Sequence, residues 1–281
     1  MLLPTWATLS SLSDEELFNL FEASGEHEFP QPSLIKSTSV RQIASDAVMK
    51  VRPEESDSEP VTMHLVRETT TIPVPAVRRY FNYRGRSVVI MDFIPGQTLA
   101  DRWPSLSYWR RFWVLYTIRR YIRELRRVEV PGTPRHSQFP GRIGREPQVC
   151  YGPMFSEYGG GPFASYDELT SWFMHKLDVN RQIRGAPTED VRFDSSLPLV
   201  LTHLDLHPNN VILDRKGRVW LIDWEHAGFY PQWFEYMVMQ DGWEILGRWR
   251  RQTVGLMAGF YQRQTDFVAS IGWAILTGFL L

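Results

Sequence analysis

Residues 199–231 limit the possible folds more than any other segment, because short apolar runs there end in polar side chains. The runs at 200–202 and 219–222 have the composition of buried strands, and 211–213 predicts a third strand. Residues 215–217, Arg-Lys-Gly, predict a hairpin turn between the last two strands. The polar residues that can carry metal or proton chemistry are His203, Asp205, His207, Asn210 and Asp223.

Asp205, Asn210 and Asp223 have the spacing and the chemistry that phosphoryl transfer needs. Asp205 and Asn210 are five positions apart, so a tight loop can direct both side chains to one point. Asp223 follows the next pair of strands and can approach the same point. Carboxylate and amide oxygens suit Mg²⁺, which takes its other ligands from water and a substrate phosphate. One carboxylate then remains to accept a proton from, or to orient, an attacking hydroxyl.

The order of these residues matches the kinase arrangement of an Asp, an Asn five residues later and a metal-binding Asp. It is written here as HLDLHPNN at 203–210, followed by IDWE at 222–225. With these motifs the chain resembles the aminoglycoside phosphotransferase/choline kinase-like family, in its fungal type. The resemblance continues at 71–75, 90–96 and 161–163, and it covers about residues 34–240.

The resemblance implies an α+β, protein-kinase-like fold of two lobes. The implied N-terminal lobe, residues 1–93, is small and β-rich with a leading helix, and the implied C-terminal lobe, 94–281, is larger and mainly helical. The residues support this division, because Ile94-Pro95-Gly96 interrupts a strand-like pattern. The pattern predicts helices at 14–24, 61–69, 107–128 and 166–182, strands at 34–51, 76–83 and 87–93, and mostly loop at 131–165.

The resemblance also implies which residues bind ATP. Lys50, at the end of a predicted strand, matches the lysine that contacts the α- and β-phosphates. Glu59, at the start of the following helix, is the candidate acidic partner that orients Lys50. The alternative partners are Glu54, Glu55 and Glu68. The linker residues expected to bond the adenine through their backbone are Met91, Asp92 and Phe93.

The same resemblance assigns catalysis to the loop that begins at His203. Asp205 is the implied catalytic base or hydroxyl-positioning group, and Asn210 and Asp223 are the implied Mg²⁺ ligands. His203 is expected to brace this loop.

The chain departs from the family pattern at two places. Leu204 stands where the family has a glycine before the catalytic aspartate. Residues 34–50 contain no glycine, although a loop that covers phosphates normally uses glycine to bring its N–H groups close. Ser37, Thr38 and Ser39 would have to take this role. A kinase-like binding or regulatory protein without turnover therefore stays open as an alternative.

The composition excludes several other classes of protein. With 43% hydrophobic and 22% charged residues, the chain is typical of a globular protein rather than a disordered or fibrous one. A net charge of −1 argues against a nucleic-acid partner, which would require a surplus of positive charge. Cys150 is the only cysteine, so no internal disulfide framework is possible. The first residues lack the pattern of a signal peptide, and we expect a cytoplasmic protein.

Two apolar segments bear on membrane contact. In 107–128 the apolar residues, among them Trp109, Phe112, Trp113 and Tyr116, are predicted to form a buried helix face, with the arginines on a solvated face. Contact of this arginine-rich helix with phosphates or anionic lipids is a minor alternative. Residues 267–281 carry no charge, but a helix of that length spans about 22 Å, less than a bilayer core of about 30 Å. We expect a buried terminal helix, with a membrane-associating tail as a minor alternative.

These observations predict an ATP- and Mg²⁺-dependent phosphotransferase that moves the γ-phosphoryl group to a hydroxyl of a small molecule. A protein kinase is less favoured, because no A-P-E element follows Asp223 and residues 228–236 run directly into an expected helix. The sequence defines neither the acceptor nor the oligomeric state.

Overall fold

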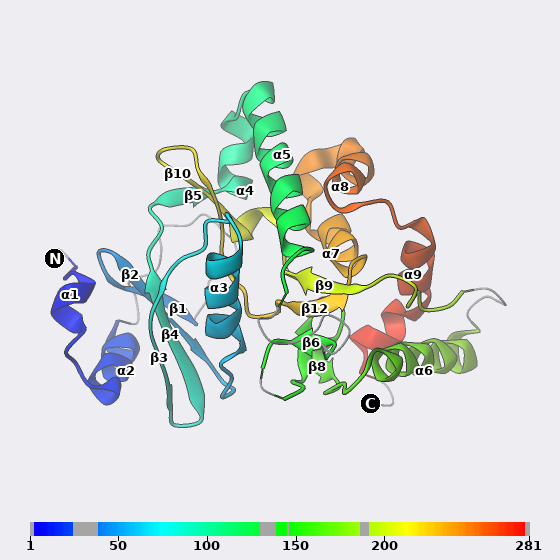
Figure 1. The fold of residues 1–281 in the computed structure, drawn as a ribbon, viewed down its shortest axis with the longest axis horizontal. Coiled ribbons are helices and arrows are strands. Elements are labelled where there is room, and N and C mark those ends of the chain that lie inside the picture. The colour runs from blue at the N-terminus through cyan, green and yellow to red at the C-terminus, as the bar shows by residue number, and fades with distance from the viewer. Residues whose placement is uncertain (1–2, 25–38, 130–138, 145, 186–190, 279–281) are drawn as a thin grey trace.

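The computed structural model describes residues 3–24, 39–129, 139–144, 146–185 and 191–278. A strand-rich lobe and a larger helical lobe lie side by side, with the N-terminus at the outer end of the first (Figure 1). This mixed α+β architecture confirms the predicted fold class.

The N-terminal lobe is built on a four-stranded antiparallel sheet in the order β1-β2-β4-β3. Arg84 and Gly85 form the turn between β3 and β4, and both have positive φ, at 52° and 74°. The strands are β1 (Val40–Ala44), β2 (Ala47–Arg52), β3 (Val77–Tyr83) and β4 (Arg86–Asp92).

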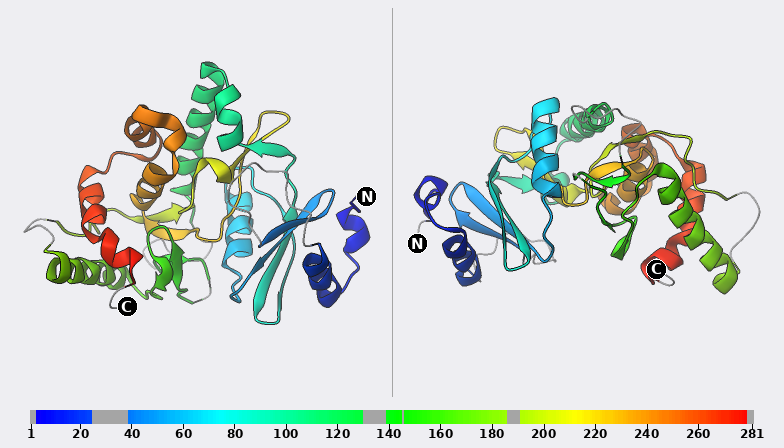
Figure 2. Two further views of the ribbon diagram at one scale, coloured as in Figure 1. Left: turned by 180° about the vertical axis from the view of Figure 1, so that it is seen from behind. Right: turned by 60° about the horizontal axis from the view of Figure 1, so that its bottom comes forward.

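The two faces of this sheet pack against different helices, because side chains alternate along each strand. Met49 and Val51 of β2 pack with α1 (Trp6–Leu9) and α2 (Asp14–Ala23) in a separate apolar cluster, on the outer side of the sheet (Figure 2). Val48 packs with α3 (Ser58–Thr69) and the C-terminal lobe. Lys50 therefore points with Val48 toward the other lobe.

The chain leaves this sheet after β4 and joins two small sheets of the C-terminal lobe. The first has the order β11-β10-β5, and the second has the order β6-β12-β9. Val211 pairs with Leu221, which confirms the predicted hairpin around 215–217. The strands are β5 (Gly96–Thr98), β6 (Gly141–Arg142), β9 (Leu199–Thr202), β10 (Val211–Asp214), β11 (Val219–Leu221) and β12 (Gly228–Pro231).

Helices and a large aromatic cluster form the rest of this lobe. Phe173 is fully buried, and its ring lies 4.9–6.3 Å from the rings of five neighbours, Phe155, Trp172, Phe193, Phe234 and Phe267. The α-helices are α4 (Leu99–Arg102), α5 (Tyr108–Leu125), α6 (Tyr166–Arg184), α7 (Phe234–Gly242), α8 (Arg250–Ala258) and α9 (Gln262–Leu276). The 3₁₀ helices are η1 (Trp103–Ser105), η3 (Pro208–Asn210) and η4 (Glu244–Trp249).

Three predicted boundaries differ from the structure. The helix expected at 61–69 begins at Ser58, so the preceding loop is shorter. The region 131–165, expected to be mostly loop, includes β6 and the paired strands β7 (Cys150–Gly152) and β8 (Ser156–Gly160). Residues 228–231 form β12 before α7 begins, because they pair with β9 and β6 rather than continuing into a helix.

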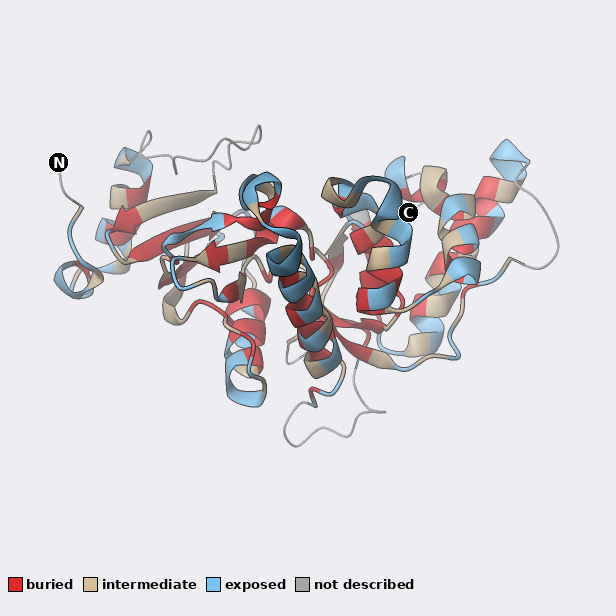
Figure 3. Cartoon of the chain, turned by 90° about the horizontal axis from the view of Figure 1, so that it is seen from above, coloured by how far each residue is buried: buried red, intermediate tan, exposed pale blue. Residues whose placement is uncertain are grey.

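The orientation of α5 differs most from expectation. The prediction placed Trp109, Phe112, Trp113 and Tyr116 on the buried face, but all four are exposed. Figure 3 shows helices of the chain with exposed residues along one side and buried residues along the other. The face that packs into the lobe is instead made by Val114, Thr117, Ile118, Tyr121, Ile122 and Leu125. Aromatic residues occur at helical spacing on the outward face, so periodicity alone could not identify the inner one.

The predicted terminal helix is present as α9, and its apolar residues Phe267, Ile271 and Ala274 are buried. The helix packs against α6 (Figure 1). None of the helices among the described residues is long and apolar enough to cross a bilayer.

Candidate active site

Lys50 is the centre of a buried charge cluster between the lobes. Its Nζ lies 2.9 Å from Glu59 Oε1, 2.6 Å from Asp223 Oδ1 and 2.7 Å from Glu225 Oε2. The Lys50 side chain is only 5% exposed, whereas that of Asp223 is 35% exposed. Arg52 adds a second cation, 2.7 Å from the same Glu225 oxygen. The cluster joins β2 and α3 of one lobe to the end of β11 in the other.

Lys50 and Asp223 stabilise each other's ionised forms. Burial by itself lowers the pKa of Lys50, but the carboxylates of Asp223, Glu59 and Glu225 outweigh burial and raise this pKa above its ordinary value. Burial acts on Asp223 in the opposite sense, yet the charge and hydrogen bond of Lys50 hold the pKa of Asp223 at about 2. Lys50 therefore stays protonated and Asp223 ionised at neutral pH.

The structure places Glu59, rather than its alternatives, against Lys50. Glu59 is 4% exposed in the first turn of α3, which points its carboxylate at the β2 lysine. Glu54 instead bonds Arg142, with 2.8 Å between Oε1 and Nη1. Burial raises the pKa of Glu59 and the charge of Lys50 opposes that rise.

The loop after β9 holds Asp205 and Asn210 together. Asn210 Nδ2 donates to Asp205 Oδ2 at 2.8 Å and to the Asp205 carbonyl oxygen at 3.0 Å. These bonds fix the orientation of the Asp205 carboxylate and use the amide nitrogen, which leaves Asn210 Oδ1 as the oxygen that can bind a cation. Ile222 N donates to the Asn210 carbonyl oxygen, so Asn210 and Asp223 flank the same end of the β10–β11 hairpin.

His203 braces this loop, as the sequence predicts. It is fully buried, and its Nε2 lies 3.0 Å from the carbonyl oxygen of Ile222, next to Asp223. Burial lowers the pKa of His203 to about 4, so the ring is neutral at pH 7. Leu204 follows with φ of 60°, a conformation that costs a non-glycine residue about 1–2 kcal/mol. The leucine side chain is fully buried, which offsets this cost.

Glu235 is a residue of the site that the sequence reasoning missed. It is 1% exposed in the first turn of α7, and its Oε2 accepts the backbone N–H of His203 at 2.7 Å and that of Leu204 at 3.5 Å. Burial raises the pKa of Glu235 to about 7, although these two hydrogen bonds act to lower it. A glutamate in an apolar helix, FEYMVM, was the available signal, because a carboxyl group on a buried face requires partners.

The linker expected to bind adenine lies at the end of β4. Two of its N–H groups are already used: Asp92 N donates to the Ala76 carbonyl and Phe93 N to the Asp46 carbonyl, both at 3.0 Å. Met91 is largely buried in the core. The binding roles of Met91, Asp92 and Phe93 stay predictions.

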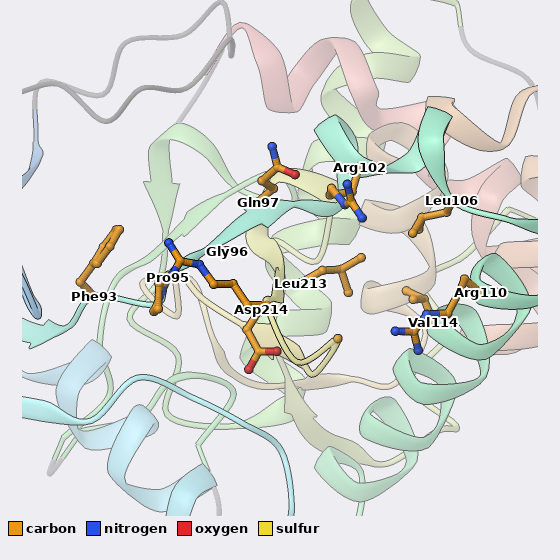
Figure 4. A pocket seen from close by; sticks show the side chains of 12 residues that line it. Phe93, Pro95, Gly96, Gln97, Arg102, Leu106, Arg110, Val114, Leu213 and Asp214 are labelled. Carbon is orange, nitrogen blue, oxygen red and sulfur yellow. The ribbon is translucent and has the colours of Figure 1, made fainter.

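A cavity of about 550 Å³ lies beside this linker, and Figure 4 shows its walls. Phe93 lines it together with α4, the start of α5 and the β10–β11 turn. Its described lining includes none of Lys50, Asp205 and Asp223, so it is separate from the charge cluster. The proposed phosphate-covering residues Ser37 and Thr38 lie outside the described residues.

The donor set at the hairpin end fits a magnesium ion. Asp223 keeps a partly exposed carboxylate, and Asn210 has an oxygen directed by the bonds of its amide nitrogen. The described residues hold no cluster of three or more His, Cys, Asp or Glu suited to a metal. Mg²⁺ does not require one, because it is commonly held by one or two protein oxygens together with phosphate oxygens and water.

The two lobes, the Lys–Glu pair and the Asp–Asn loop define a protein-kinase-like phosphotransferase. Comparison with known proteins agrees: a sequence profile of the phosphotransferase enzyme family, APH, matches residues 53–265. The chain belongs to this aminoglycoside phosphotransferase/choline kinase-like family, as the motifs predicted. The match begins after Lys50, so it includes the loop from His203 to Asn210 but not the first two strands.

Solved structures show the same fold at low sequence identity. APH(2")-IIa, in a ternary complex with streptomycin and ATP, is 14% identical, with 94% of this chain and 90% of that chain covered and a TM-score of 0.56. Macrolide 2'-phosphotransferase MphH from Brachybacterium faecium is 12% identical, with 95% and 94% covered and a TM-score of 0.50. A search of curated proteins found no match.

Proposed function

We propose that the chain is an ATP- and Mg²⁺-dependent kinase that phosphorylates a hydroxyl group of a small molecule. The observation that carries this proposal is the convergence of Lys50, Glu59 and Asp223 at 2.6–2.9 Å, beside a loop in which Asn210 orients Asp205. A cation tied to both lobes suits the phosphates of a nucleotide, and an oriented carboxylate suits a hydroxyl.

Lys50 is proposed to bind the α- and β-phosphates. Glu59 holds its ammonium group in place from α3, and burial of both side chains restricts their motion. Glu225 is part of the same support, since it bonds Lys50 and Arg52. When a nucleotide binds, its phosphates replace part of the negative charge that the carboxylates supply to Lys50.

Asp205 is proposed to orient the acceptor hydroxyl and to take its proton. In the reaction the acceptor oxygen forms a bond to the γ-phosphorus while the bond from that phosphorus to the β–γ bridging oxygen breaks. ADP leaves with the electron pair, and the hydroxyl proton goes to Asp205. Asn210 Nδ2 keeps the carboxylate aligned through its 2.8 Å bond. A bound Mg²⁺, held by Asn210 and Asp223, would neutralise phosphate charge.

The lobe boundary at 93/94 is part of the same proposal. β4 ends at Asp92, and the next strand, β5, pairs with β10 of the catalytic segment. Residues 1–93 would then supply the nucleotide-phosphate side, and residues 94–281 the catalytic and acceptor side. The cytoplasmic location also stays a proposal.

The test is ADP release in the presence of ATP and Mg²⁺ with a panel of hydroxyl-bearing acceptors. The panel begins with streptomycin and a macrolide, because APH(2")-IIa binds streptomycin in its ternary complex and MphH is a macrolide phosphotransferase. The proposal expects acceptor-dependent ADP release with at least one compound, lost in Asp205→Asn by about 10²–10⁴-fold. Equal turnover by Asp205→Asn would contradict the catalytic role of that carboxylate.

A further inference from the structure

The outward surface of α5 carries large aromatic side chains that no described residue covers. Tyr108 is 87% exposed, Trp109 72%, and Phe112 and Tyr116 59% each. Their rings form a continuous row, with centroids 5.7 Å apart from Trp109 to Phe112 and 6.5 Å apart from Phe112 to Tyr116. We call these four residues, with Trp113, the aromatic face.

Helix geometry places this face directly away from the core. Trp109, Phe112, Tyr116 and Arg123 are three, four and seven positions apart, so they share one side of the helix. The buried residues Val114, Thr117, Ile118, Tyr121 and Leu125 occupy the opposite side. A solvated helix face normally carries polar residues, and a row of exposed rings is unusual for a surface without a partner.

The apolar surface continues onto the neighbouring helix. Arg119 of α5 donates to the Leu256 carbonyl oxygen of α8 at 2.6 Å, which ties the two helices together. Leu256 is itself 58% exposed, so an aliphatic side chain extends the aromatic face toward the C-terminal half of the lobe. The two helices pack against each other in the ribbon as well (Figure 1).

Positive charge surrounds this surface. Within 108–125 the chain has five arginines, at positions 110, 111, 119, 120 and 123, against the single acidic residue Glu124. Arg120 is half exposed and reaches Glu124 at 3.4 Å, whereas Arg123 is exposed and forms no ion pair with any described residue. Arg120 and Arg123 lie one to two turns beyond the rings on the same side of the helix. Arg110 and Arg111 point elsewhere, since Arg110 lines the cavity beside the linker and Arg111 donates to the Trp103 carbonyl oxygen.

We propose that α5 docks the protein on the surface of an anionic lipid bilayer. Tryptophan and tyrosine favour the boundary between headgroups and acyl chains, because their rings are apolar and their N–H or O–H groups stay hydrated. Arginine binds lipid phosphates and anionic headgroups while its stem covers apolar surface. The protein would lie on the bilayer without crossing it, with α5 in the interface plane.

A bilayer suits this surface better than a second copy of the chain. Two copies meeting through α5 would bring together two strongly positive helices, whereas phosphatidylserine supplies the opposite charge. The sequence left lipid contact of this arginine-rich helix open as a minor alternative, beside the apolar C-terminus. In that segment Phe267, Ile271, Ala274 and Ile275 are buried in the core, and residues 279–281 lie outside the described residues.

Flotation of the full-length protein with vesicles tests the proposal. Phosphatidylcholine vesicles with and without about 30 mol% phosphatidylserine are compared, because the anionic lipid sets the surface potential. The wild-type protein is expected to float with the anionic vesicles and only weakly with the neutral ones. Trp109→Ser/Phe112→Ser is expected to lose about tenfold or more of the partition coefficient. Arg120→Gln/Arg123→Gln is expected to lose about thirtyfold, at about 1 kcal/mol for each arginine.

Matched controls use exposed residues away from α5. Ile183→Ser on α6 and Arg263→Gln on α9 change similar side chains at exposed positions and are expected to bind like the wild type. Every variant is checked for an unchanged thermal midpoint. The proposal is overturned if the wild type fails to float with anionic vesicles, binds both vesicle types equally, or keeps its binding in both α5 double variants. Light scattering that shows a dimer dissociated by Trp109→Ser/Phe112→Ser would assign the face to contact between copies and also overturn it.

Discussion

Replacing Glu235 by glutamine should change how the stability of the protein depends on pH. Glu235 is 1% exposed, and one of its oxygens accepts the N–H of His203 while the other, Oε1, has no hydrogen-bond partner among the described residues. An ionised carboxylate with one unsatisfied oxygen is costly to bury. Glutamine keeps the shape and one acceptor oxygen but cannot ionise. The variant Glu235→Gln therefore isolates the cost of ionisation.

The magnitude follows from the pKa of Glu235, which is about 7 in the folded chain against an ordinary value of 4.5. Below pH 4.5 the group is protonated in both states and costs nothing. Between the two values the unfolded chain ionises first, so unfolding becomes progressively easier as the pH rises. Above pH 7 the cost is constant at about 3 kcal/mol, since each pH unit between the values contributes about 1.36 kcal/mol.

Urea unfolding at several pH values between 4.5 and 8 measures this effect. The free energy of unfolding of the wild type, minus that of Glu235→Gln, should fall by about 3 kcal/mol across the range. The matched control is Glu244→Gln, at an exposed position in η4, which should leave the pH dependence of the wild type unchanged. A difference between wild type and Glu235→Gln that does not vary with pH would refute the reasoning.

Two further variants test the charge cluster and the core. Lys50→Met removes the cation that three carboxylates share, so the free energy of unfolding at pH 7 should fall by about 3–5 kcal/mol. Part of this loss should be recovered at lower pH, because those carboxylates take up protons. If the stability of this variant does not depend on pH, the account is contradicted. Phe173→Ala removes a fully buried ring from the aromatic cluster and should lower the free energy of unfolding by about 3–5 kcal/mol. The control Phe112→Ala, at an exposed position, should lower it by less than about 0.5 kcal/mol. Urea unfolding measures both. Equal losses of stability in the two variants would show that the aromatic cluster does not stabilise the C-terminal lobe.

The fold of residues 199–231 could be predicted because the strands and the candidate site residues lie close together in the sequence. The apolar runs at 200–202, 211–213 and 219–222 gave the strands, and the intervening polar residues gave the loop. The Lys50–Glu59 contact was also predictable, since the start of a helix that follows a strand can return a carboxylate to that strand. In each case local sequence and tertiary contact favour the same arrangement.

Other features depend on contacts that the sequence does not reveal. β6 and β12 form only because they pair with segments far away in the chain, so their own residues look like loop or helix. The prediction of the buried face of α5 was wrong, because the outward face is also apolar and periodicity does not indicate which face is covered. For Glu235, the apolar helix around it indicates a buried carboxyl group, but its partners are backbone N–H groups, which the sequence does not identify.

Thermal unfolding with ATP, in the presence and absence of Mg²⁺, tests the central claim most directly because it requires no knowledge of the acceptor. At about ten times its Kd, a nucleotide stabilises the folded chain by about 1.4 kcal/mol, which raises the midpoint by about 3–5 °C in a protein of this size. The account predicts such a shift with Mg²⁺ and its loss in Asp223→Ala, whose partly exposed carboxylate is the proposed ligand. No shift with millimolar ATP and Mg²⁺, or an equal shift in Asp223→Ala, would contradict it.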